Sequence, residues 1–194
     1  MKWRARRALC AVCMIPLVLA GLGCEESRAP KIDVLLGAGA ARTFAPVSAL
    51  ARYIELAGEP DRLTIVLSSY EVGCDRFENP PPGEIFVSVT VEAPPGVGLQ
   101  KGDFPWPGLV DGVQSAETPV ALPFVRLASE GRALPGGGLL KLETLEPVLH
   151  GQVRGSLLFQ DSTEGGAPTF RLVGPFSARI CRAVLDPTRR QNQP

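Results

Sequence analysis

Residues 85–92 have the sequence IFVSVTVE, and this short run decides the fold class. Every second residue from Ile85 to Val91 is apolar and β-branched, and Ser88 and Thr90 lie between them. Side chains alternate between the two faces of a strand, so a period of two predicts a strand with one buried face. The run therefore indicates a β-rich domain.

The same alternation occurs before and after this run. It recurs in residues 63–68 and 140–143, and residues 153–160 and 169–182 predict a hairpin around a polar, glycine-rich loop at 162–168. In the last segment one face is apolar and consists of Phe176, Ala178 and Ile180. The 21 glycines and 19 prolines suit many short strands joined by turns. We expect an all-β fold, a single β-sandwich-like domain built of two sheets.

Residues 46–57 fit two structures. Leu50, Tyr53 and Ile54 have helical spacing with Gly58 as a stop, yet the segment also alternates as a strand would. A turn at 58–61 and a strong strand follow at once, an arrangement that would make a hairpin. The period does not decide between helix and strand.

The N-terminus has the order of an export signal. Four basic residues precede Ala8, and an uncharged stretch of 16 residues runs from there to Gly23. That stretch contains Pro16 and is shorter than the roughly 20 residues of a membrane-spanning helix. Residues 1–23 are therefore predicted to be a signal peptide rather than a permanent membrane span.

The sequence Gly21-Leu22-Gly23-Cys24 resembles the lipobox of bacterial lipoproteins. The resemblance implies lipidation (palmitate among the acyl groups) at Cys24, a lipidated tether at 24–31, and a membrane partner reached through that anchor. Gly21 departs from the family, which prefers leucine there. The alternative is an ordinary secretory signal that leaves Cys24 as a free thiol. Glu25 after the cysteine matches the sorting pattern for the cell outer membrane and leaves open which side the domain faces.

Charge argues against one class of partner. Removal of residues 1–23 takes away four basic residues and no acid, leaving 16 basic and 20 acidic residues. A mildly acidic chain without a basic stripe in its sequence predicts no nucleic acid partner.

Cysteine usage points to an oxidising compartment. After cleavage and lipidation only Cys74 and Cys181 remain, and an even pair in an exported domain predicts a disulfide. The alternative is two unpaired buried thiols. We expect neither a metal nor a cofactor, since His150 is the only histidine and no Cys-x-x-Cys pair survives cleavage.

No catalytic motif is evident in the sequence. The sequence has no G-x-S-x-G serine for which His150 could act as general base, and His150 is interpreted as a surface residue at the end of a strand. Paired carboxylates would suffice for a hydrolase acting on envelope polysaccharide, which is our alternative function. The candidate acids are Glu71, Asp75, Glu78, Asp161 and Glu164. We expect solvated turn residues at these positions and no enzymatic activity.

Phe104 and Trp106 alternate with prolines in the sequence Phe-Pro-Trp-Pro-Gly. Aromatic residues on a stiff loop can stack on sugars or anchor a partner protein, so these two are candidate contact residues for a protein or glycan. The alternative is a hydrophobic plug that closes one end of the domain. We predict that residues 94–119 form a long surface excursion.

Residues 44–49, residues 63–68, Cys74 and residues 174–181 together resemble a pattern in uncharacterised lipoproteins of GC-rich Gram-negative bacteria. The resemblance implies a β-sandwich-like domain and no activity. We expect the β-rich domain to cover 32–186 and a C-terminal tail to cover 187–194. The expected function is a non-catalytic binding or structural module of the cell envelope.

Overall fold

The computed structural model describes residues 30–36, 40–75, 80–106, 119–127, 130–133, 137–160 and 170–185. In these residues all regular secondary structure is β-strand, which confirms the all-β expectation. The strands are β1 (Ile32–Leu36), β2 (Arg42–Phe44), β3 (Ser48–Ile54), β4 (Arg62–Ser68), β5 (Ile85–Glu92), β6 (Gly102–Trp106), β7 (Val120–Leu127), β8 (Glu130–Ala133), β9 (Gly138–Leu145), β10 (Gln152–Gln160) and β11 (Phe170–Val184). The predicted signal peptide, Cys24 and the C-terminal tail lie outside the described residues.

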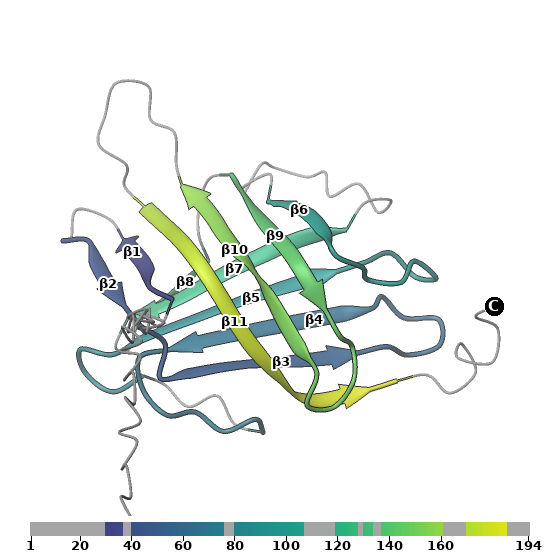
Figure 1. Ribbon diagram of the computed structural model, residues 1–194. Coiled ribbons are helices and arrows are strands. Elements are labelled where there is room, and N and C mark those ends of the chain that lie inside the picture. The colour runs from purple at the N-terminus through teal and green to yellow at the C-terminus, as the bar shows by residue number, and fades with distance from the viewer. Residues whose placement is uncertain are drawn as a thin grey trace, which may run out of the picture.

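The strands form one continuous sheet rather than two separate ones. Its order is β6-β9-β10-β11-β3-β4-β5-β7-β8, and β1 and β2 extend it beside the first part of β11. The sheet curls until β6 contacts β7, which gives a nearly closed, barrel-like sheet. Figure 1 shows β9, β10 and the first part of β11 crossing in front of β3, β4 and β5. The expected two sheets are thus two opposed walls of a single curled sheet.

The long strand β11 joins the two walls. Its first part pairs antiparallel with β1 and β10, and its last part pairs parallel with β3. The strand passes from one wall to the other near Arg179, where its pairing with β10 ends and its pairing with β3 begins. Gly174 lies before this point and has a φ of 152°. The backbone carbonyl of Lys31 occupies the space that a Cβ atom at this position would need. Glycine is therefore required both for the backbone angle and for the close approach of β1.

Apolar residues at every second position fill the space between the walls. Val87 and Val89 of β5 are fully buried, as are Leu157 and Phe159 of β10. The predicted face of β11 also points inward, because Phe176, Ala178 and Ile180 are all buried. The sequence periodicity thus identified the core correctly in these strands.

The ambiguous segment is a strand. Residues 48–54 form β3, which pairs with β4 from Ser48↔Ser68 to Ile54↔Arg62. Gly58, with φ 76°, lies in the turn between the two strands. Pairing on both sides, with β4 and with β11, fixes the strand where the local pattern was undecided.

Part of the predicted surface excursion is a strand. Residues 102–106 form β6, which pairs only with β9. Pro105 cannot donate a backbone hydrogen bond, and an edge strand tolerates this because one side of it is unpaired. The strands β1, β2, β7 and β8 were not predicted, because the alternation in their sequences is weaker.

Candidate functional site

A loop segment covers the outer surface of one wall. We call residues 69–75 the strap. The N–H of Ser69 donates to the carbonyl of Ile85, and the N–H of Val72 donates to Ser48 Oγ at 3.0 Å. Val66 faces outward from β4, on the side opposite the core residues Ile65 and Leu67, yet it is fully buried. The outer side of this wall therefore has a buried apolar position outside the main core, on the side that the strap crosses.

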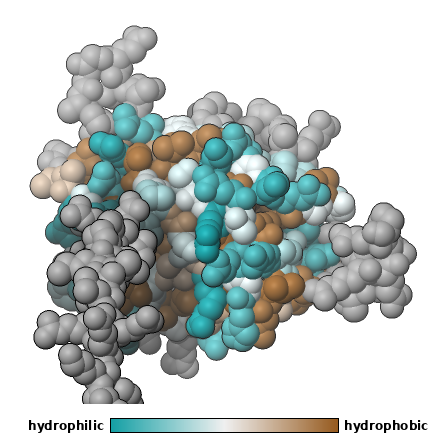
Figure 2. Space-filling model, viewed as in Figure 1, coloured by the Kyte–Doolittle hydropathy of each residue, from teal (hydrophilic) through white to brown (hydrophobic). Residues whose placement is uncertain are grey.

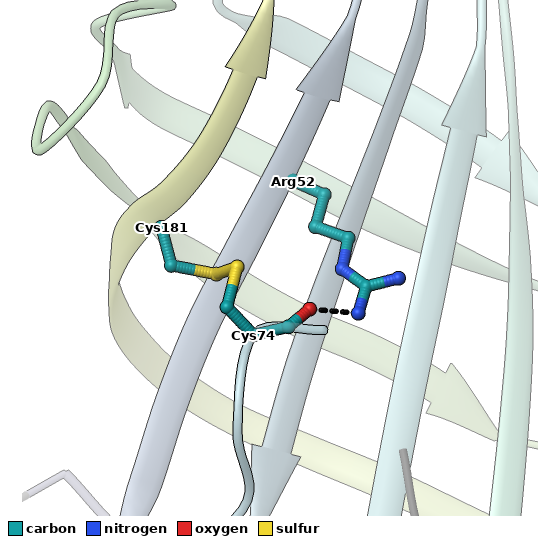
Figure 3. Close-up of a disulfide and its surroundings, with 3 residues drawn as sticks. All are labelled: Arg52, Cys74 and Cys181. Carbon is teal, nitrogen blue, oxygen red and sulfur yellow. Dashed lines mark hydrogen bonds between the residues drawn. A yellow bond between two sulfur atoms is a disulfide. The ribbon is translucent and has the colours of Figure 1, made fainter. Parts of the chain in front are cut away.

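The predicted disulfide holds the strap in place. Cys74 is bonded to Cys181, with their Cα atoms 5.9 Å apart and 107 residues of sequence between them. Figure 3 shows the bridge passing over β3, so that the strap is tied to β11 across an intervening strand. The pairing of β11 with β3 shifts register between Ile180 and Arg182, which leaves Cys181 at the irregularity.

Arg52 reinforces the same attachment. Its guanidinium donates a hydrogen bond to the carbonyl of Cys74 (Figure 3). Burial lowers the pKa of Arg52, the neighbouring positive charge of Arg182 lowers it further, and Asp75 acts in the opposite direction. Arginine stays protonated in proteins, so the contact is a permanent charged hydrogen bond. We therefore assign Arg52 to holding the strap.

The opposite wall is bare on its outer surface. Leu158 of β10 is 47% exposed, although it lies directly between Leu139 and Val173 on the neighbouring strands. Pro105 pairs with Leu139 in register and extends the same row to β6. We call Pro105, Leu139, Leu158 and Val173 the apolar row. It crosses four adjacent strands, and Leu158 and Pro105 are its most exposed members.

Arginines lie along the part of β10 and β11 that forms this wall. Arg154, Arg171 and Arg179 are exposed there, and neither strand contains an acidic residue. Arg182 follows the register shift and pairs with Arg52 on the wall of the strap. The adjacent β9 carries exposed Lys141 and Glu143. Arg171 lies 3.9 Å from Asp33 on β1, and Arg154 donates to the Gln152 side chain at 2.7 Å. Figure 2 shows this face, with hydrophilic side chains along its middle and hydrophobic ones gathered over the end of β10 and the start of β11.

The arginines of this hairpin were not evident from a count of charges over the chain after residue 23, where acids outnumber bases. The readable signal was the lack of any acid in 152–160 and 170–184, which are adjacent strands of one hairpin. Strand pairing places the exposed Arg154, Arg171 and Arg179 on one face. A count of charged residues over the chain does not reveal this arrangement.

Phe104 and Trp106 are not on an exposed loop. Both lie in β6, with exposed fractions of 5% and 7%, and both belong to the main core. Two alternate positions of a strand share one face, which explains why both rings point inward. The structure favours the alternative interpretation, a hydrophobic plug, and leaves neither ring exposed as a contact surface.

The candidate acids are either exposed or outside the described residues. Glu71 and Asp75 are exposed on the strap, whereas Glu78, Asp161 and Glu164 are not described. Among the described side chains the one buried acid is Asp61, which accepts a hydrogen bond from the Tyr53 hydroxyl at 3.5 Å. The carbonyl of Asp61 also accepts from the N–H of Ala93. Asp61 thus joins the β3–β4 turn to the end of β5, and the hydrolase alternative remains a prediction.

His150 lies exposed in the turn between β9 and β10, as expected of a surface residue. Its φ is 67°, and its N–H donates to the carbonyl of Ile180 at 2.8 Å. Within the part of the chain that the structure describes, no group of three His, Cys, Asp or Glu side chains could hold a metal ion.

An open depression of about 430 Å³ lies beside the β5–β6 loop. Residues 97–104 and Pro119 line it, and its charged side chains are Lys101 and Asp103. A cleft that buries a small ligand is enclosed and mostly apolar, with convergent polar groups. This shallow surface has neither property.

Comparison with protein families, with curated proteins and with solved structures finds no match to this chain. The described residues contain no helix with the length and apolar character needed to cross a bilayer.

Proposed function

We propose that this chain is an envelope lipoprotein, exported, lipidated at Cys24 and held at the outer membrane. Its barrel-like domain would act as a non-catalytic binding or structural module toward a protein or glycan. The observation that carries the proposal is the Cys74–Cys181 bridge. Structural disulfides persist in exported proteins and are rare in the reducing cytosol.

The N-terminal pattern supports the same compartment. A basic region, an uncharged stretch and Cys24 follow one another in the order typical of a lipoprotein precursor. Several acyl chains would hold the protein at the bilayer far more durably than a single chain. The resemblance to uncharacterised lipoproteins agrees with this interpretation and supplies no activity.

The packed interior supports a module without an active site. Fully buried apolar residues from β4, β5, β9, β10 and β11 meet between the two walls. The described acids lie on the strap, in turns or on outer faces. This arrangement favours a stable scaffold whose outer surfaces carry the function.

Radiolabelled palmitate tests the anchor directly. Cells expressing the wild-type chain should incorporate label into this protein, and Cys24→Ser should abolish incorporation because its hydroxyl replaces the acylated thiol. Cys13→Ser is the matched control and should label like the wild type, since Cys13 leaves with the signal peptide. Equal labelling of wild type and Cys24→Ser would contradict the proposal.

A further inference from the structure

We propose that the outer face of β9, β10 and β11 lies against the anionic surface of the membrane that holds the lipid anchor. The inference rests on the proposed function, because it requires lipidation at Cys24. It adds an interaction surface, namely the apolar row together with the exposed arginines of β10 and β11.

The first argument is the position at which the chain leaves the fold. The backbone of Lys31 passes directly over Gly174 of β11, and Asp33 pairs with Val173, a member of the apolar row. The seven residues from Cys24 to Pro30 span at most about 25 Å when fully extended. A lipid on Cys24 therefore holds this end of the wall close to the bilayer.

The second argument is charge complementarity. The chain after residue 23 has more acids than bases, so an anionic surface repels it on average. The β10–β11 hairpin is the exception: Arg154, Arg171 and Arg179 are exposed on it and it contains no acid, although Arg171 lies 3.9 Å from Asp33 of β1. Basic residues near an anionic membrane surface are attracted to it. The face beside the tether is thus the one with the right charge to meet the membrane.

The third argument is the exposed apolar row. Leu158 is 47% exposed, with Leu139 and Val173 on either side of it. An exposed leucine on the same strands as exposed arginines suits a surface that rests in the headgroup region, where apolar side chains enter the lipid and cations meet phosphate. A nucleic acid would bind the arginines through its phosphates, but it would make few contacts with an apolar row. The combination of arginines and apolar side chains therefore favours lipid.

A fluorophore on a single cysteine tests the contact in the lipidated protein. Cys10 and Cys13 leave with the signal peptide, Cys24 is acylated, and Cys74 and Cys181 are bridged. Leu158→Cys therefore supplies the one free thiol for labelling. Val97→Cys is the matched control, because Val97 is 45% exposed in the β5–β6 loop, across the barrel from β1 and β2 (Figure 1).

The labelled proteins are reconstituted in vesicles of phosphatidylcholine and phosphatidylglycerol that carry nitroxide-labelled lipid. We expect quenching at position 158 to be about twofold or more stronger than at position 97, because the label at 158 enters the headgroup region. Neutral vesicles should reduce the difference, and so should Arg154→Glu combined with Arg179→Glu. Arg62→Glu combined with Lys101→Glu makes the same charge change elsewhere and should leave quenching at 158 unaltered.

Equal quenching at the two positions in protein that floats with the vesicles would overturn this inference and leave the anchor intact. Quenching that is independent of phosphatidylglycerol, or displacement of the 158 label from vesicles by duplex DNA, would overturn it as well. Failure of the wild-type protein to float would reject both the anchor and the membrane-facing surface.

Discussion

Both walls of the barrel are apolar on the inside, but their outer faces differ. Outside β3 and β4 the strap is tied across the sheet, and outward-facing Val66 is completely buried. On the outside of β10, Leu158 is 47% exposed. The covered wall is fastened by a disulfide and the half-buried Arg52, whereas the bare wall has exposed arginines and an apolar row. The difference indicates that one wall stabilises the domain and the other is available for contact.

Removal of the disulfide should have the largest effect. For a loop of about a hundred residues the chain-entropy model attributes about 4–5 kcal/mol of stability to the cross-link. We expect Cys74→Ser combined with Cys181→Ser to lower the free energy of unfolding by that order, measured by urea denaturation. A thiol reductant should destabilise the wild type and leave the double variant unchanged. Equal denaturation midpoints for the two proteins would show that the strap is held by packing alone.

Leu158 and Phe159 are neighbours on β10 that face opposite sides of the bare wall, so their variants compare its outer and inner faces. Phe159 is fully buried, and Phe159→Ala should cost about 3–5 kcal/mol because it leaves a cavity in the core. Leu158→Ala should change the stability of the soluble domain by less than about 0.5 kcal/mol. Thermal unfolding of both variants without lipid gives the comparison. A large loss at Leu158 would mean that the apolar row is covered in solution.

Val66 tests whether the outer packing depends on the strap. Val66→Ala should cost about 2 kcal/mol while the bridge is intact, because a fully buried side chain is truncated. In the Cys74→Ser background the cost should fall by about 1 kcal/mol, since a released strap no longer buries this position. A double-mutant cycle from urea denaturation measures the coupling. Strict additivity would assign the burial of Val66 to the sheet rather than to the strap.

The local alternation of apolar residues was sufficient to predict those strands that have one face buried in the core. The alternation in residues 63–68 and 85–92 predicted β4 and β5, because each side chain there has a fixed environment on one side of the sheet. The pattern was insufficient at 102–106, where Pro105 suggested a loop although an edge strand accommodates it. Cys74 and Cys181 were paired correctly because only two cysteines remained after export and lipidation were assumed.

The candidate site was less accessible to sequence reasoning. Phe104 and Trp106 were interpreted as loop aromatics, and only their place in β6 turned them toward the core. Arg154, Arg171 and Arg179 were visible in the sequence but lie up to 25 positions apart, and only antiparallel pairing places them on one face.

The sequence by itself determined the strand-forming segments, the inward-facing residues of β4, β5 and β11, and the pair of cysteines available for a bridge. These properties depend on side-chain period and residue type, which are local. The tertiary structure alone decided the parallel pairing of β11 with β3, the course of the strap over β4, and the contrast between the covered and the bare wall. Such features arise from contacts between segments far apart in the chain, for which no local pattern carries a signal.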